Sequence, residues 1–297
     1  MPARSSVAIL YAFVANVVVG VAKAAAAWYT GSSTLLAETL HTFADCGNQV
    51  LLWIGIARAR KPPTTRHPLG HGKELYFWSF IVALLLFFGG GAAAVIEGIE
   101  QLRHPVQISK GWVALTTLGF ALVCEAVSLR AALREVRSVR DLKTFYRWFR
   151  ETWRSELLVV VTEDLAAVLG LAIALVAVSA SLLTHRTELD AIGSIAIGLL
   201  LLVAAGSVLI EVKALLIGES AHQRTRDAIT AALEDCEGVV KVRSLITLQY
   251  GRDVFVAANI RVARTSMEHV DALLRRCHRR VRESNAAIRH IFIEPSV

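Results

Sequence analysis

Charged residues are scarce in this sequence. Asp, Glu, Lys and Arg together make up 19% of its 297 residues, whereas 55% of the residues are hydrophobic. An ordinary soluble domain is about 45–50% apolar even when glycine is counted. The shortage of charge therefore argues against a soluble protein and predicts one that lies in a membrane.

Cysteine is scarce as well, and its spacing excludes two kinds of site. The four cysteines lie far apart and form no Cys-x-x-Cys pair. That spacing excludes a disulfide framework and a zinc cluster built from thiolates. We expect single buried thiols at Cys46, Cys124, Cys236 and Cys277.

The formal net charge is +7, but this excess does not indicate nucleic-acid binding. The basic residues gather in particular loops and in the C-terminal region, as a membrane topology requires. We therefore expect no nucleic-acid partner.

Six apolar segments follow one another over the first 217 residues. At a rise of about 1.5 Å per residue, each is long enough to cross a hydrocarbon core about 30 Å thick. The first has no short apolar region with a cleavage site, so we expect a spanning helix and not a signal peptide. The predicted spans are about 7–29, 34–58, 75–100, 112–133, 156–183 and 190–217.

Positive charge lies on one side of these spans. Five Lys and Arg residues follow the second span and eight follow the fourth, whereas the opposite connections carry only Arg103, Lys110 and Arg186. The positive-inside rule then places both termini in the cytoplasm. The arginine-rich and aromatic stretch after the fourth span predicts a helix that leaves the membrane and then runs along its surface.

From about Glu219 the composition becomes that of a small soluble domain. A helix over 223–236, strands over 239–250 and 254–262, a helix from the cap Ser266 to about Asn285, and a last strand give the order α-β-β-α-β. The predicted fold is an all-α six-helix transmembrane domain (1–218) followed by a cytoplasmic α+β domain (219–297). This second domain is expected to be ferredoxin- or metallochaperone-like.

The second span carries polar residues where a membrane helix would be apolar. Glu38, His41, Asp45 and Asn48 recur every three or four residues, so a helix places them on one face. A charge at bilayer depth costs about 2.5–3.5 kcal/mol on insertion scales, so it marks a functional site by default. His41 and Asp45 lie one turn apart and can reach the same ion.

The fifth span holds a second cluster, Thr162, Glu163 and Asp164. Carboxylates in hydrocarbon need a cation partner or a proton. One imidazole with two or three carboxylates suits Zn²⁺, and also Co²⁺, Fe²⁺, Mn²⁺ or Ni²⁺. Metal binding releases protons from such ligands, so the pattern predicts metal/proton exchange. The alternative is that His41 and Asp45 form a structural hydrogen bond.

Other polar residues allow two interpretations each. Asn16 serves helix packing or binds the ion, and Asp190 caps a helix or lies just outside the site. His67 and His71 are solvated residues of a cytoplasmic loop or capture metal there. Glu38 supports His41 or faces a water-filled vestibule.

Over almost its whole length the sequence resembles the cation diffusion facilitator family. The resemblance lies in the six spans, in H-x-x-x-D of the second span (His41 and Asp45), and in the loop H-P-x-G-H-x-K-x-E (His67–Glu74). It extends to the α-β-β-α-β domain. Within the family, the sequence most resembles the branch with E-D-x-A-A-x-x-G in the fifth span (Glu163–Gly170) and a closing F-I-E-P (Phe292–Pro295).

The resemblance implies a homodimeric divalent-metal/proton antiporter with a tetrahedral site between the second and fifth spans. His41, Asp45 and Asp164 match three of the four family ligands. The fourth position, one turn before Asp164, holds Val160. Glu163 is the expected substitute, but it lies about 100° round the helix from Asp164, so the span would have to rotate or unwind.

The cytoplasmic domain also departs from the family pattern. Members with accessory zinc sites have H-x-D in the last strand, where this sequence has Phe292 and Glu294. We therefore expect a dimerisation domain with weak or no metal binding. His269, His290 and Glu294 are the remaining candidates for a metal site there, and are interpreted as surface residues.

These features predict a multi-pass protein of a bacterial inner or plasma membrane that exports a divalent metal, Zn²⁺ first, in exchange for protons. The predicted metal ligands are His41, Asp45, Glu163 and Asp164. No prosthetic group is expected, and the partners are the ion, protons, lipid and a second copy of the chain. The alternative is a membrane-bound sensor or scaffold that binds metal without moving it. An enzyme is not expected, since no H-E-x-x-H motif or nucleophile constellation is present.

Overall fold

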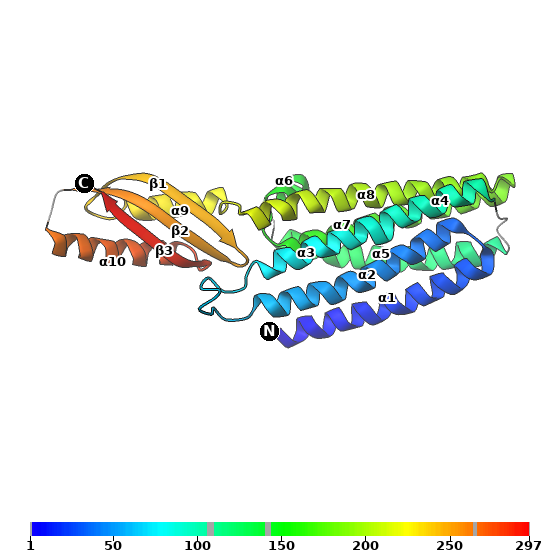
Figure 1. Cartoon of the computed structure of the whole chain (residues 1–297), viewed down its shortest axis with the longest axis horizontal. Helices are drawn as coiled ribbons and strands as arrows, with labels where there is room; N and C mark the ends of the chain where they lie inside the picture. Colours follow the sequence, from blue (N-terminus) through cyan, green and yellow to red (C-terminus); the bar gives the residue numbers. More distant parts are fainter. Residues whose placement is uncertain (1, 106–109, 140–143, 264–265, 297) are drawn as a thin grey trace. The chain divides into compact units, whose positions relative to one another are not determined.

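The computed structural model describes residues 2–105, 110–139, 144–263 and 266–296. They form two compact units (Figure 1). Unit 1 comprises Met1–Ala57 and Phe77–Val212, and unit 2 comprises Arg58–Tyr76 and Lys213–Val297. The predicted fold class, a helical part with a smaller α+β part, is confirmed.

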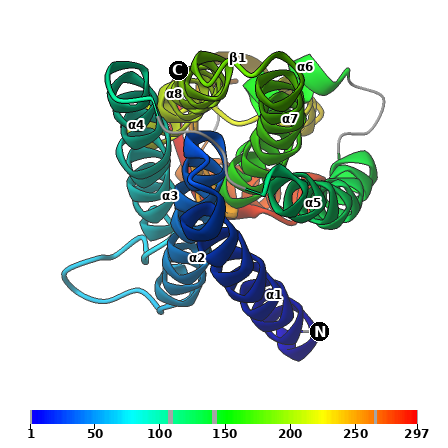
Figure 2. The ribbon, with the colours of Figure 1, turned by 90° about the vertical axis from the view of Figure 1, so that its right-hand side faces the viewer.

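Unit 1 is built from long helices that lie lengthwise beside one another, as the nearly end-on view in Figure 2 shows. The predicted segments all become helices, and most extend a few residues further than predicted. The helix of the third segment contains a π-helical stretch, η1, between α3 and α4. The elements are α1 (Pro2–Thr30), α2 (Ser33–Ala59), α3 (Glu74–Leu85), η1 (Leu86–Ala92), α4 (Ala93–Arg103), α5 (Gly111–Val139), α6 (Phe145–Glu151), α7 (Ser155–Thr184) and α8 (Glu188–Ile217).

Four of these helices, within the described residues, are long and apolar enough to cross a membrane. They are Glu74–Arg103, Gly111–Arg137, Ser155–Thr184 and Glu188–Ile217. α2, at 27 residues, has the length for a span. It buries acids, a histidine and hydroxyl side chains. The protein is therefore a multi-pass membrane protein in which the polar helix lies among apolar ones.

Glycine lets η1 and α4 approach α8 closely. A Cβ atom at Gly91 would lie 2.9 Å from the Leu202 side chain, and one at Gly98 would lie 2.8 Å from the backbone oxygen of Ala191. Gly91 and Gly98 thus allow close helix packing, whereas a Cβ atom at Gly89 would meet nothing within 4 Å.

The N-terminus of α2 is capped by a residue from α8. Asp190 is fully buried. Its Oδ2 accepts a 2.8 Å hydrogen bond from the backbone N–H of Ser33, and its Oδ1 accepts one of 2.8 Å from the Ser32 hydroxyl. Of the two interpretations of Asp190, the structure favours helix capping, and the helix capped is α2.

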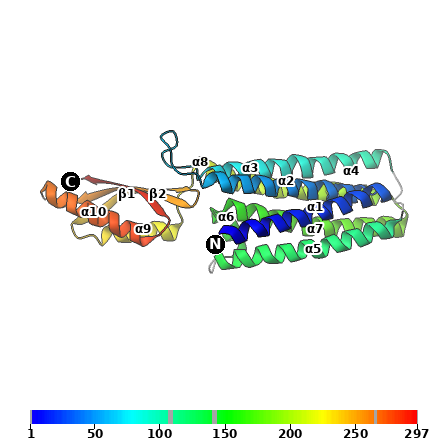
Figure 3. The same ribbon diagram turned by 90° about the horizontal axis from the view of Figure 1, so that it is seen from below.

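Unit 2 contains a three-stranded sheet in the order β1-β2-β3, covered on one side by two helices (Figure 3). β1 and β2 are antiparallel, and β2 and β3 are parallel. The predicted order α-β-β-α-β is confirmed. The elements are α9 (Gln223–Glu234), β1 (Val239–Tyr250), β2 (Asp253–Val262), α10 (Met267–Ser284) and β3 (Ile288–Ser296).

Alternation along β2 decides which face of the sheet is covered. Val254, Val256, Ala258 and Ile260 are buried against the core of α9 and α10. Ser266 precedes α10 as predicted, but its hydroxyl makes no capping bond to the backbone. It lies instead 2.7 Å from Nδ1 of His269.

The connection between α2 and α3 lies in unit 2 and is fastened to the β1–β2 turn. The Tyr76 hydroxyl donates a 3.1 Å hydrogen bond to the Gly251 carbonyl, and the Tyr250 hydroxyl donates one of 3.0 Å to the Gly70 carbonyl. Gly251 has φ +62°, and a Cβ atom there would lie 2.8 Å from the backbone oxygen of Gly72. The second half of this connection is therefore held against the β1–β2 turn.

Candidate metal site

The polar stripe of α2 points into the helix bundle. Glu38, His41, Asp45 and Asn48 are all buried, with exposed fractions between 0% and 5%. Their spacing of three or four residues keeps them on the inner face of α2. The prediction of one buried polar face is confirmed.

On α7, the two acids of the second cluster face different neighbours. Glu163 is buried and interacts with Asp45 and Asn48 of α2. Asp164 is half-buried, and its Oδ2 accepts a 3.1 Å hydrogen bond from the Ser128 hydroxyl of α5. The structure thus brings Glu163 to the α2 stripe and Asp164 to α5, in keeping with the angle of about 100° between consecutive helical residues.

Val160 lies with the apolar residues on the α5 side of α7. It packs against the cluster that includes Val136, Trp148 and Leu157. Position 160 is thus part of a hydrophobic contact, which a carboxylate or an imidazole would disrupt.

Several polar atoms of the stripe have no hydrogen-bond partner. Nδ1 of His41 lies 3.5 Å from Oδ1 of Asp45. Neither ring nitrogen of His41 makes a hydrogen bond, nor do Oδ1 of Asp45 and the amide group of Asn48. An unsatisfied buried polar group costs about 1–3 kcal/mol. The stripe is therefore suited to a polar or cationic occupant that supplies the missing interactions.

The predicted ligands are not gathered around one point. Among the residues that the structure describes, no group of three or more His, Cys, Asp and Glu side chains is placed to hold a metal ion. His41 and Asp45 form a pair, Glu163 lies beside Asp45, and Asp164 is engaged by Ser128. Complete coordination of an ion would need a rearrangement of α7 relative to α2.

Sequence reasoning missed one charged partner of the stripe. Lys23 of α1 is buried, and its Nζ lies 3.2 Å from Oε2 of Glu38. The same Nζ donates a 2.9 Å hydrogen bond to the Thr42 hydroxyl. A lysine inside an apolar span was the available signal, but the sequence did not show which acid it pairs with.

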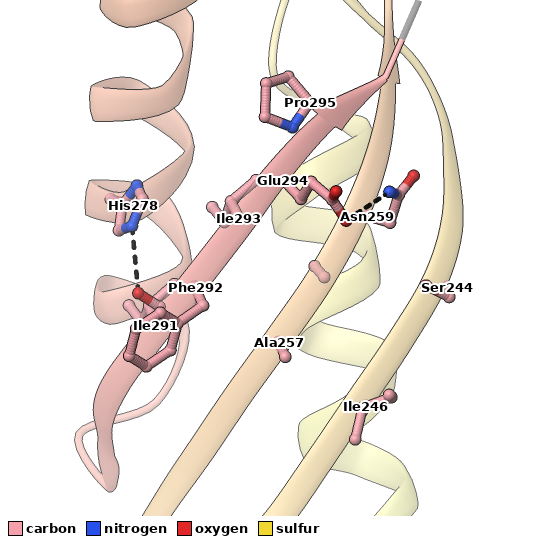
Figure 4. Close-up of a pocket in the computed structure, with 11 residues that line it drawn as sticks. Ser244, Ile246, Ala257, Asn259, His278, Ile291, Phe292, Ile293, Glu294 and Pro295 are labelled. Carbon is pink, nitrogen blue, oxygen red and sulfur yellow. Dashed lines mark hydrogen bonds between the residues drawn. The ribbon is translucent and has the colours of Figure 1, made fainter.

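The candidates in unit 2 are dispersed. Glu294 accepts a 2.9 Å hydrogen bond from Asn259, as Figure 4 shows, and Phe292 stacks on Phe255 with ring centroids 5.2 Å apart. His290 lies near Phe255, and His269 is exposed at the start of α10. His67 and His71 pack edge to face with centroids 4.7 Å apart. His67 is exposed, whereas His71 is half-buried.

The cysteines are free thiols. Cys46, Cys236 and Cys277 are buried as predicted, whereas Cys124 is half-buried. Burial and, after it, the neighbouring Cys236 raise the pKa of Cys277 to about 12. The Cys277 thiol therefore stays protonated at neutral pH, as a packing residue does.

Comparison with known proteins also divides the chain into two parts, although Arg58–Tyr76, which belongs to unit 2, falls within the first of them. The family model described as the cation efflux transmembrane domain matches residues 9–217, and the model of the cation efflux protein cytoplasmic domain matches residues 221–295. The first match covers α1 and α2 together with the four apolar spans.

Curated relatives match most of this chain. One is the mitochondrial proton-coupled zinc antiporter SLC30A9 of Xenopus laevis, 32% identical over 76% of this chain and 41% of the relative. Another is metal tolerance protein C4 of Arabidopsis thaliana, 30% identical over 72% of this chain and 49% of the relative. The chain thus spans less than half the length of these relatives.

A solved structure also aligns with part of the chain. The MamM CTD in a cadmium form is 18% identical, covering 25% of this chain and 95% of that one, with a TM-score of 0.25. The two family matches together account for nearly all of the described residues, and the chain belongs to the cation diffusion facilitator family.

Proposed function

We propose that the chain exports a divalent metal ion, Zn²⁺ first, across a membrane in exchange for protons. The observation that carries the proposal is the buried face of α2, where His41, Asp45 and Asn48 have unpaired polar atoms beside Glu163 of α7. Two relatives, one named a proton-coupled zinc antiporter and the other a metal tolerance protein, support it.

The chemistry follows from the ligand types. An imidazole and carboxylates bind Zn²⁺ when they are deprotonated, so binding of the ion and of protons at His41, Asp45, Glu163 and Asp164 is mutually exclusive. Protons that enter from the side opposite the cytoplasm displace the ion from the site and release it on that side. The proton gradient thereby drives export of the ion from the cytoplasm. Each pH unit contributes about 1.4 kcal/mol per proton.

We propose that the described arrangement precedes full coordination. Glu163 stands beside Asp45, whereas Asp164 is held by Ser128. A local unwinding of α7 that releases Asp164 from Ser128, while Glu163 stays beside Asp45, would bring a third carboxylate to His41 and Asp45. Alternating access would then accompany the movement of Asp164 from Ser128 to the ion at His41 and Asp45.

The cellular arrangement belongs to the same proposal. Residues 1–218 form the transport domain and residues 219–297 a cytoplasmic domain, with both termini in the cytoplasm of a bacterial cell. The open face of the sheet exposes Ile246 and Phe292. Two copies of the chain would bury these residues by pairing through this domain, giving a homodimer.

The test is transport by the full chain in proteoliposomes with an imposed pH gradient, for Zn²⁺, Mn²⁺, Co²⁺ and Fe²⁺. Wild-type protein is expected to couple metal uptake to proton counter-flow, and Asp45→Asn and Glu163→Gln to abolish both. Asp227→Asn on the exposed surface of α9 is the matched control and should transport normally. Metal binding without flux under any gradient would refute the transporter and favour the sensor or scaffold.

A further inference from the structure

An ion pair lies in the middle of unit 1, between α1 and the stripe of α2. Lys23 is 1% exposed and Glu38 is 0% exposed. Nζ of Lys23 lies 3.2 Å from Oε2 of Glu38 and 2.9 Å from the Thr42 hydroxyl. Two charges buried at this depth are costly, and removing one partner leaves the other uncompensated. Such a pair calls for an explanation beyond helix packing.

Glu38 has the chemistry and the position of a metal ligand. It lies on the same face of α2 as His41 and Asp45, one turn before His41. Its second oxygen, Oε1, is buried and has no hydrogen-bond partner. A carboxylate with one free oxygen on the stripe would join a cation at His41 unless something held it away.

Two residues hold it away. Lys23 binds Oε2 from α1, while Oε1 occupies space left by Gly170 of α7, where a Cβ atom would lie 2.7 Å from that oxygen. Any larger residue at 170 would push the carboxylate out of this place. Gly170 follows Glu163 by about two turns of the same helix, so one segment of α7 supplies both the acid beside Asp45 and the room for Glu38.

The charges around Lys23 show what its removal would do. It interacts electrostatically with Glu38, His41, Asp45 and Glu125. Glu125 of α5 in turn interacts with Glu38, Glu163 and Asp164. Lys23 is thus the cation that offsets one member of a crowded set of carboxylates.

We propose that Lys23 is a positioning residue that holds Glu38 against Gly170, outside the metal site, and so sets the cation preference of that site. The inference rests on the proposed function. With Glu38 withheld, the site keeps an imidazole and a limited number of carboxylates, which suits Zn²⁺. With Glu38 released, the site gains a hard oxygen ligand, which suits Mn²⁺.

The experiment compares metal binding by Lys23→Met, Lys23→Gln and Lys23→Arg with wild type, using purified full-length protein and calorimetric titration of Zn²⁺ and of Mn²⁺. Lys23→Met and Lys23→Gln should raise the affinity for Mn²⁺ about tenfold relative to that for Zn²⁺, a change at the low end of typical outer-shell effects. Lys23→Arg keeps the charge and should behave as wild type. Lys213→Met, at an exposed position of α8, is the matched control.

A double variant separates positioning from folding. In Lys23→Met/Glu38→Gln the pair is neutral and the released carboxylate is gone, so the preference for Zn²⁺ over Mn²⁺ should return. In flux measurements Lys23→Met should lower both KM and kcat for Mn²⁺, because the ion is retained. If Lys23→Met fails to fold, Lys23→Gln and the double variant carry the test.

Other outcomes overturn the inference. An unchanged Mn²⁺/Zn²⁺ ratio in Lys23→Met and Lys23→Gln, or equal ratios in the single and double variants, would show that Lys23 does not position Glu38. A wild-type protein that binds metal but never transports it would refute the proposed function, and the binding ratios would still decide the role of Lys23.

Discussion

The Ser128 hydroxyl of α5 donates a 3.1 Å hydrogen bond to Oδ2 of Asp164 on α7. This bond turns Asp164 away from α2, while its neighbour Glu163 interacts with Asp45. The two acids of one sequence motif therefore have different partners. Coordination of a cation by Oδ2 of Asp164 would compete with its bond from Ser128.

Replacing Ser128 should make Asp164 more available. A hydrogen bond to a charged group contributes about 1.5–3 kcal/mol, and 1.4 kcal/mol corresponds to about tenfold in affinity. Ser128→Ala is therefore expected to raise Zn²⁺ affinity by about tenfold, measured by calorimetric titration of the full chain. Ser128→Thr keeps the hydroxyl and should leave the affinity unchanged. A loss of affinity in Ser128→Ala would mean that the bond orients Asp164 for binding.

Asp190 should contribute to stability and not to ion binding. Its carboxylate accepts hydrogen bonds from the backbone of Ser33 and from the Ser32 hydroxyl at the start of α2. Loss of a helix cap costs about 0.5–2 kcal/mol. Asp190→Ala should lower the thermal unfolding temperature in detergent while leaving the Zn²⁺ affinity of the folded protein unchanged. A large drop in affinity at unchanged stability would instead place Asp190 in the ion path.

The two tyrosine hydroxyls that fasten residues 58–76 to the β1–β2 turn should act together. Each hydrogen bond is worth about 1 kcal/mol. One runs from Tyr76 of the segment to Gly251 of the turn, and the other runs from Tyr250 to Gly70 of the segment. Tyr76→Phe and Tyr250→Phe should each speed amide hydrogen exchange over residues 66–73. The effect of the double variant should be close to the sum of the two single effects. Tyr146→Phe, on the exposed side of α6, is the control. Unchanged exchange in the double variant would show that the glycine contacts alone hold the segment.

The sequence was sufficient for features that depend on local periodicity. Apolar runs predicted the long helices to within a few residues, and the strands over 239–250 and 254–262 were predicted in the same way. The spacing of Glu38, His41, Asp45 and Asn48 predicted one buried face, because helix geometry alone determines it.

Features that depend on the rotation of one helix against another were not predictable. Nothing local in the sequence identifies Glu38, fifteen residues further on, as the partner of Lys23. Whether Glu163 or Asp164 faces α2 depends on how α7 is turned, a choice that Ser128 on α5 and the apolar cluster around Val160 influence. The fastening of the α2–α3 connection was not predictable either, because it depends on Tyr250 far along the chain.

Cys277 offers a pH-dependent test of the core of unit 2. Burial raises its pKa to about 12, so folding favours the neutral thiol over the thiolate. The stability that this preference contributes is complete below the ordinary thiol pKa of about 8.5. It is lost as pH rises through about 12, when the folded protein must accept a buried thiolate. We expect unit 2 of the full chain to lose stability against urea between these pH values, and Cys277→Ala to reduce the loss.

At pH 8, iodoacetamide should alkylate Cys277 far more slowly in the native protein than in urea. Equal labelling rates in the two states would contradict the burial of this thiol, whereas slow labelling that persists in Cys236→Ala would assign the effect to burial and not to the neighbouring sulfur.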